Sequence, residues 1–301
     1  MTIEDPRALL HRYNLRPRKS LGQNFLVDPS APARIVQGAE VGPADTVLEV
    51  GAGLGTMTAE LVARAARVIA VETDPNLIAV LNDELGEKQN LTIVHGDILA
   101  LDPLALLAVE HTKAQPDAEP TRPLWGKWLP HYCVVANLPY YITAASIRHL
   151  LEARVRPSRI VITIQREVAK RIVASTGKMS LLSVGVQFYA KPKILFKLKR
   201  GAFYPAPKVE SAVMRLDLYK DPLVEVEDIA GFFRVVRAGF SQRRKQLRNT
   251  LSSVLGLAAT EVEDALLIVD VDPTRRAETL SLVEWGRVVN ALAGCSGEEG
   301  E

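Results

Sequence analysis

The sequence has few cysteines and no long apolar run. Its 301 residues include only two cysteines, Cys133 and Cys295, and neither has a Cys or His neighbour at metal-ligand spacing. We therefore expect neither a disulfide framework nor a metal site. No apolar stretch approaches the roughly 18 residues that a membrane-spanning helix needs, and the first 20 residues are polar and rich in arginine. The expectation is a cytoplasmic protein that does not enter a membrane.

An excess of charge of one sign is also missing. Lys and Arg number 37 against 35 for Asp and Glu, so the net charge is only +2. Overall charge therefore gives no indication of a nucleic-acid partner, and local clusters have to decide that question. Hydrophobic residues make up 48% and charged residues 24%, which is the balance of a globular enzyme and excludes a disordered chain.

Short β-branched runs alternate with helical patterns between residues 46 and 165. This alternation predicts βαβ units and a mostly parallel sheet with crossover helices. The expected strands are 46–50, 67–72, 91–96, 132–137 and 159–165. The expected helices are 56–65, 75–85, 144–152 and 167–174. Two more strands, 193–198 and 211–218, are expected to add an antiparallel edge.

The pattern becomes entirely helical after Asp221 and Pro222. We therefore predict an α/β domain over residues 1–220 and a small all-helical domain over residues 221–301. The connection 101–130 is long and carries several prolines and two tryptophans, which indicates a surface insertion with its own partial packing. The pattern suggests no function for it.

A glycine-rich turn follows the first expected strand. Gly51, Gly53 and Gly55 have the spacing Gly-x-Gly-x-Gly, whereas the dinucleotide fingerprint is Gly-x-Gly-x-x-Gly. Without Cβ atoms the backbone can approach a ligand closely. A tight strand-to-helix turn without a ligand is the alternative interpretation.

Two carboxylates are expected at the same edge of the sheet. Glu72 ends the second strand, where an acid can accept hydrogen bonds from both hydroxyls of an adenosine ribose, and Asp97 follows the third strand. Either acid alone could simply cap a helix. Together with the glycines they favour an adenosine-bearing cofactor, and both NAD and S-adenosyl-methionine meet that description.

The residues Asn137, Leu138, Pro139 and Tyr140 follow the fourth expected strand. The amine of adenine is a poor nucleophile because its lone pair is delocalised into the ring. The Asn137 side-chain oxygen and the Leu138 carbonyl can accept its two hydrogens and make the nitrogen more nucleophilic. Tyr140 offers an aromatic face for the base, and Pro139 fixes the turn. In isolation the tetrapeptide would be interpreted as an ordinary turn.

Five segments together resemble the ribosomal RNA adenine dimethyltransferases. They are residues 21–26, 51–55, 137–140, 203–209 and 240–245. The resemblance implies a Rossmann-like, S-adenosyl-methionine-dependent methyltransferase sheet of the α/β class with a small all-helical C-terminal domain. It also implies N6,N6-dimethylation of adjacent adenosines in small-subunit (16S) ribosomal RNA by a monomer, on the small subunit or its precursor, in ribosome biogenesis.

The resemblance also assigns roles to matching residues. Phe203 matches the aromatic residue that stacks the target adenine against Tyr140. The family often has Pro where Ala52 stands, and residues 101–130 form a longer connection than the family implies. The implied catalytic set is Asn137, Leu138, Pro139, Tyr140 and Phe203. The implied cofactor-binding set is Gln23, Asn24, Leu26, Gly51, Gly53, Glu72, Asp97 and Asn137.

Two basic clusters are candidates for binding RNA phosphates. The first is Arg234, Arg237, Arg243, Arg244, Lys245 and Arg248, of which we predict the last four to be the RNA-binding set. The second is Lys191, Lys193, Lys197, Lys199, Arg200 and Lys208. We expect an apolar helical stripe of Leu247, Leu251 and Val254, with Arg244 and Arg248 on another face. For either cluster a solvated basic surface is the alternative.

Three other functions stay open at this point. A large-subunit ribosomal RNA methyltransferase conferring macrolide resistance would share most of the chemistry, although residues 21–26 and 240–245 fit the small-subunit branch better. An NAD-dependent oxidoreductase would explain the glycines and Glu72 but not residues 137–140. A non-catalytic RNA-binding relative would keep the basic surface and lose methyl transfer.

Overall fold

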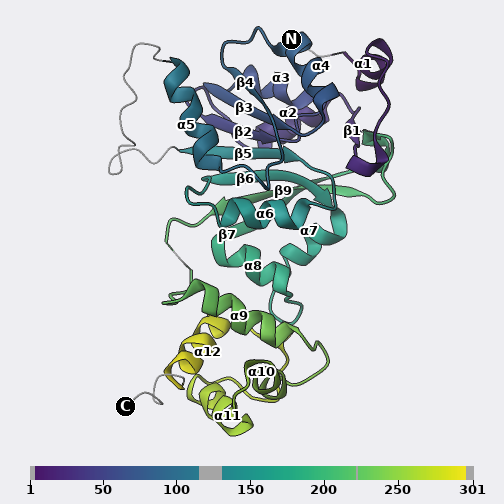
Figure 1. The fold of residues 1–301 in the computed structure, drawn as a ribbon. Coiled ribbons are helices and arrows are strands. Elements are labelled where there is room, and N and C mark those ends of the chain that lie inside the picture. Colours follow the sequence, from purple (N-terminus) through teal and green to yellow (C-terminus); the bar gives the residue numbers. More distant parts are fainter. Residues whose placement is uncertain (1–3, 115–130, 222, 296–301) are drawn as a thin grey trace. The chain divides into compact units, whose positions relative to one another are not determined.

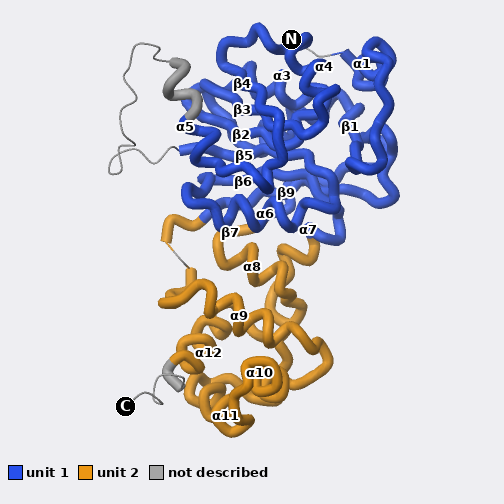
Figure 2. Tube along the Cα trace, in the orientation of Figure 1, with its two compact units in different colours: residues 1–169, 193–218 blue, residues 170–192, 219–301 orange. Residues whose placement is uncertain are grey.

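A computed structural model describes residues 4–114, 131–221 and 223–295. It contains two compact units, which Figure 2 shows in separate colours. Unit 1 is residues 1–169 and 193–218, and unit 2 is residues 170–192 and 219–301. Unit 2 thus takes in a segment before residue 220 as well, and the domain boundary at that residue remains a prediction.

A seven-stranded sheet organises unit 1, in the spatial order β4-β3-β2-β5-β6-β9-β7 (Figure 1). The first five strands in this order are parallel, and β9 runs antiparallel to β6. The predicted α/β class and the five parallel strands are therefore confirmed. The bounds are β2 Thr46–Val50, β3 Arg67–Glu72, β4 Leu91–His95, β5 Tyr132–Asn137, β6 Arg159–Gln165, β7 Ala190–Leu198 and β9 Ser211–Leu218.

Helices bury both faces of this sheet. Val47 and Leu48 are adjacent in β2, so their side chains point to opposite faces, and both are fully buried. Val47, Val68 and Ala70 lie on the same face, which packs against α2 (Ala31–Gly38), α3 (Thr56–Val62) and α4 (Pro75–Leu85). The remaining helices that begin in unit 1 are α1 Pro6–Arg12, α5 Pro103–Ala114, α6 Thr143–Leu151 and α7 Arg166–Ile172.

A short second sheet brings the N-terminal segment to the end of the main sheet. The 3-10 turn Lys19–Leu21 leads into β1 (Phe25–Leu26), which pairs antiparallel with β8 (Phe203–Tyr204). Leu26 lies opposite Phe203, and both side chains are buried in the cluster that also holds α2 and α3. Segments 21–26 and 203–209 are two of the five segments that carry the sequence resemblance. They are thus adjacent in space.

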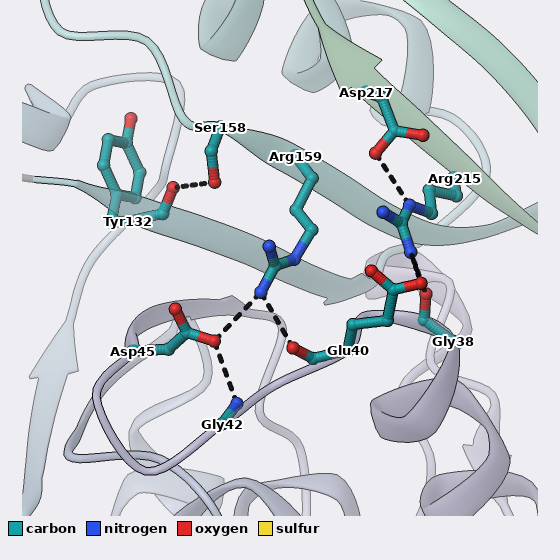
Figure 3. Close-up of polar contacts among 9 residues, drawn as sticks. All are labelled: Gly38, Glu40, Gly42, Asp45, Tyr132, Ser158, Arg159, Arg215 and Asp217. Atoms are coloured by element: carbon teal, nitrogen blue, oxygen red, sulfur yellow. Dashed lines mark hydrogen bonds and ion pairs between the residues drawn. The ribbon is translucent and has the colours of Figure 1, made fainter.

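Two arginines hold the amino ends of the strands (Figure 3). Arg159, the first residue of β6, donates from Nη2 to the Asp45 carboxylate and to the Glu40 carbonyl, each at 2.9 Å. Arg215 of β9 forms ion pairs with Glu40 at 2.8 Å and with Asp217 at 2.7 Å. These contacts tie the loop between α2 and β2 to β6 and β9. The opposite, carboxyl ends of β2, β3 and β5 are left to line a cavity.

Unit 2 is built from helices around aromatic side chains. Phe232 and Trp285 are fully buried, and the rings of Phe188 and Phe232 lie 4.7 Å apart between centroids. The predicted helical C-terminal part is confirmed. The elements that begin in unit 2 are α8 Leu181–Tyr189, α9 Ile229–Phe240, α10 Leu247–Leu255, α11 Ala259–Ile268, the 3-10 turn Ala277–Thr279 and α12 Leu282–Cys295.

One detail of the predicted C-terminal helix is wrong. Leu247 and Leu251 are buried as expected, but the third residue of the stripe, Val254, is 48% exposed because it lies in the last turn of α10. Arg244 is not on the helix at all, since it lies in the turn before α10 begins. Arg244 and Arg248 therefore do not share a helical face.

The long connection 101–130 begins with regular structure. Helix α5 buries Leu106 and Leu107, and the carbonyl of Leu101 lies 2.9 Å from Nε2 of His149 in α6. The rest of the expected insertion, residues 115–130 with Trp125 and Trp128, falls outside the described residues. Within the part of the chain that is described, the helices are too short or too polar to cross a membrane.

Candidate active site at the carboxyl ends of the strands

A cavity of about 320 Å³ lies where β2, β3 and β5 end. This volume is within the roughly 300 to 1,000 Å³ typical of small-molecule sites. Every residue of the predicted catalytic set and of the predicted cofactor-binding set lines the cavity. The structure thus brings both sets together in one place, and the role of each residue remains a prediction.

Glu72 is held in one orientation at the end of β3. Its carboxylate accepts hydrogen bonds from the backbone N–H groups of Gly53, Thr73 and Asp74, at 2.9, 2.8 and 3.0 Å. The side chain is only 7% exposed. Oε1 also lies 3.4 Å from the Thr73 hydroxyl, whereas among the described residues Oε2 accepts only from Gly53, so the remaining acceptor capacity is on Oε2. Glu72 also ties the glycine loop to the turn between β3 and α4.

The glycine loop lies directly against residues 137–140, the predicted catalytic motif. Gly51 has φ +78°, and a Cβ atom there would lie 3.0 Å from the Asn137 carbonyl oxygen. Only glycine tolerates both this conformation and this approach. Ala52, where the family often has Pro, is buried. The loop after β2 and the motif after β5 therefore form a continuous wall.

The N-terminal segment is fastened by its own polar side chains. Gln23 donates to Asp74 at 2.9 Å and accepts from the Arg18 N–H at 2.8 Å, so its amide is engaged within the protein. Asn24 donates to the Gly22 carbonyl at 2.8 Å. Gln23 thus has a structural function here, whatever its contact with a ligand. Asp97 is exposed after β4 and accepts from the Leu99 N–H at 3.0 Å.

The predicted catalytic motif contains one amide side chain without a hydrogen bond among the described residues and one ring that is held in place. Asn137 ends β5, and its side chain has no hydrogen bond among the described residues. The hydroxyl of Tyr140 lies 2.6 Å from that of Ser211 in β9, which fixes the ring, and burial raises the pKa of Tyr140. Phe203 is 4% exposed. Ser211 was not predicted as a site residue, because its place beside Tyr140 depends on the pairing of β9 with β6.

A buried acid lies next to the glycine loop. Glu49 in β2 is completely buried, and within the described residues neither its carboxylate oxygens nor the Thr58 hydroxyl finds a hydrogen-bond partner. Burial is the main cause that raises the pKa of Glu49 to about 8, and the charge of Glu72 adds to it. Glu49 is therefore largely neutral at pH 7. Nothing in the sequence indicated that this glutamate would be buried and neutral.

The predicted RNA-binding residues lie in unit 2. Arg243, Arg244 and Lys245 are exposed in the turn before α10, and no ion pair of theirs is found among the described residues. Arg248 differs, because it forms an ion pair with Glu263 of α11. Three of the four cations are thus free to bind an anion. Elsewhere in the described ranges, no three His, Cys, Asp or Glu side chains gather as a metal site requires.

The fold and the cavity together define a Rossmann-like methyltransferase. The structure of a dimethyladenosine transferase from Plasmodium falciparum shares the fold, with a TM-score of 0.72 and 20% identity over 90% of this chain and 98% of that one. The 23S rRNA methyltransferase ErmE is 28% identical, with a TM-score of 0.67 over 90% of this chain and all of that one.

The sequence pattern described as "Ribosomal RNA adenine dimethylase" matches residues 14–293. The chain belongs to this family, which confirms the resemblance seen in its motifs. It is 44% identical to "Ribosomal RNA small subunit methyltransferase A" of Moorella thermoacetica, over 95% of this chain and 96% of the relative. It is 40% identical to the protein of the same name from Dehalococcoides mccartyi, over 96% and 92%.

The buried acid generates a prediction about stability. The pKa of Glu49 is about 8 in the folded state against 4.5 when unperturbed, so between these values the unfolded chain loses a proton that the folded protein keeps. Stability contributed by this group is complete below pH 4.5 and is lost as the pH rises toward 8. In Glu49→Gln this loss is absent.

Urea unfolding of both proteins across this pH range provides the measurement. The variant should gain stability relative to the wild type as the pH rises. Glu84→Gln, at an acid that is half-buried and paired with Arg12, is the control and should show no such gain. Parallel pH profiles for the wild type and Glu49→Gln would contradict the assignment.

Proposed function

We propose that the protein transfers methyl groups from S-adenosyl-methionine to N6 of adjacent adenosines in small-subunit (16S) ribosomal RNA. The observation that carries this proposal is the single cavity that joins the ribose-type acceptor Glu72 to Asn137 and Tyr140. The curated relatives at 40 to 44% identity, named for the small subunit, support that choice of substrate. We propose that the protein acts in the cytoplasm as a monomer, on the subunit or its precursor, during ribosome biogenesis.

The cavity fits an adenosine-bearing methyl donor. The fixed carboxylate of Glu72 suits the two ribose hydroxyls, and Asp97 lies at the cavity edge where it can approach the adenine. Gly51 and Gly53 have φ +78° and +60°, a backbone conformation that lets the loop turn sharply at the cavity wall. When bound, S-adenosyl-methionine supplies a methyl group on a positively charged sulfur, which is already a strong electrophile. The protein's main contribution is therefore alignment of the two reactants.

The catalytic residues act on the target base. The side-chain oxygen of Asn137 and the carbonyl of Leu138 accept the two hydrogens of the adenine amine, which makes its nitrogen more nucleophilic. Tyr140 and Phe203 stack on the base. The adenine has to be unpaired or extruded, at an unstacking cost of a few kcal/mol that this stacking partly offsets.

The exposed cations of unit 2 bind the RNA backbone in this proposal. Arg243, Arg244 and Lys245 have no ion pair among the described residues, so they can neutralise phosphates without first breaking a contact. Arg248 would first have to break its ion pair with Glu263, so we expect it to contribute less to RNA binding.

The alternative substrate is large-subunit ribosomal RNA. The chain is 28% identical to the 23S rRNA methyltransferase ErmE but 44% identical to a relative named for the small subunit. The higher identity favours small-subunit RNA as the substrate. Membership of the family described as "Ribosomal RNA adenine dimethylase" argues against an NAD-dependent oxidoreductase. A non-catalytic relative would not need the complete catalytic set that lines the cavity.

Replacing Asn137 should remove chemistry and spare RNA binding. Asn137→Ala should slow single-turnover methylation of unmodified small subunits about a hundredfold or more, the usual effect of losing one preorganised polar group in a transition state. Mass spectrometry of the digested RNA should find dimethyladenosine after incubation with wild type and little with the variant. Near wild-type rates in Asn137→Ala would remove the residue from the mechanism, and product only on large subunits would favour the alternative substrate.

Neutralising the turn before α10 should weaken RNA binding. Changing Arg243, Arg244 and Lys245 together to Gln should reduce the log-log salt slope by about 0.7 to 0.9 per lost phosphate contact. Affinity is measured with small subunits at a series of salt concentrations. The control is Arg148→Gln, an exposed arginine already paired with Glu152, which should keep the wild-type slope. If the triple variant kept that slope too, the turn would be only a solvated surface.

A further inference from the structure

An exposed aromatic ring stands beside the catalytic motif. Tyr141 directly follows Tyr140, lines the same cavity and is 67% exposed. A single exposed apolar side chain is ordinary on a protein surface. This one differs because it belongs to the wall of the site and because the surrounding structure holds it in place.

The ring rests on backbone that is already fixed. Gly22 has φ +59°, and a Cβ atom there would lie 3.3 Å from Cε1 of Tyr141 and 3.1 Å from Cβ of Pro139. Glycine at this position therefore lets the N-terminal segment lie against the ring. The turn that carries the ring is closed by hydrogen bonds from the N–H groups of Ile142 and Thr143 to the carbonyls of Pro139 and Tyr140, at 3.2 and 3.4 Å. A ring ordered in advance costs little entropy when it binds.

The two adjacent tyrosines are engaged differently. The Tyr140 hydroxyl is held by Ser211, and its ring lines the cavity together with the buried Phe203. The Tyr141 hydroxyl makes no hydrogen bond among the described residues, and most of the side chain faces solvent. Tyr140 can thus serve the base inside the cavity, while Tyr141 stays available for a second flat group at its mouth.

We propose that Tyr141 is the stacking site for the nucleobase next to the target adenine. This inference rests on the proposed function and extends it from the reacting nucleotide to its neighbour. Extruding one base from an RNA strand deprives the adjacent base of its stacking partner. An aromatic side chain can replace that partner for any base, because every base has a π-face.

Substitution of Tyr141 tests whether the ring matters for RNA. In methylation of unmodified small subunits, Tyr141→Ala should raise KM about tenfold, with a smaller effect on kcat, as expected for loss of one stacked base. Tyr141→Phe, which keeps the ring and loses the hydroxyl, should restore KM. Ile268→Ala, at a side chain 78% exposed in unit 2, is the control and should behave as wild type. Equal KM values for all four proteins would overturn the proposal.

A spectroscopic measurement separates stacking from a general structural effect. A short single-stranded RNA carries 2-aminopurine beside the target adenine, and its fluorescence is read at saturating protein and S-adenosyl-homocysteine. The fluorescence should be quenched by wild type and by Tyr141→Phe, and clearly brighter with Tyr141→Ala. Equal quenching by Tyr141→Ala would contradict stacking on this ring.

Two further results keep this inference distinct from the function on which it rests. If Tyr141→Ala lost affinity for S-adenosyl-homocysteine instead of RNA, Tyr141 would be a wall of the cofactor site and the stacking proposal would be wrong. If the wild type failed to methylate either ribosomal subunit, the proposed function itself would fail. Methylation by wild type and Tyr141→Ala with the same KM would reject the stacking site alone.

Discussion

The site depends on the carboxylate of Glu72 and the three backbone N–H groups that bind it. These bonds join the loop after β2 to the turn after β3, so they hold the two segments in a fixed arrangement. They also keep a charged acceptor nearly buried without leaving it unsatisfied, which would otherwise cost several kcal/mol. Gly51 then brings the same loop against Asn137. Glu72, the proposed ribose acceptor, and Asn137, the proposed base-activating amide, thereby lie on one wall.

The strand order explains why these residues meet. β2 lies between β3 and β5 in a parallel sheet, so the carboxyl ends of all three strands reach the same edge. Open α/β sheets bind ligands at that edge. The antiparallel strand β9 adds Ser211 behind Tyr140, and the β1–β8 pair adds Phe203 from a segment distant in sequence. The arginine contacts lie at the opposite end of the parallel strands from this edge.

The sequence predicted most of the sheet because buried strands are local patterns of β-branched residues with glycine or acids at their ends. It also predicted which residues line the cavity, since they follow strands that end at one edge. What it could not predict depends on distant partners. Ser211 meets Tyr140 only through the β6–β9 register, and Glu49 becomes neutral only through burial. Arg248 is paired because α11 carries Glu263 beside it.

The most direct test of this account is calorimetric titration of the cofactor site. S-adenosyl-methionine and S-adenosyl-homocysteine should bind to the wild type, and NAD should not. Glu72→Ala should weaken binding by about 1.5 to 3 kcal/mol, the value of hydrogen bonds to a charged group, which is roughly 10- to 150-fold. Glu87→Ala, at an exposed acid outside the cavity, should leave affinity unchanged. Wild-type affinity in Glu72→Ala, or binding of NAD by the wild type, would contradict the account.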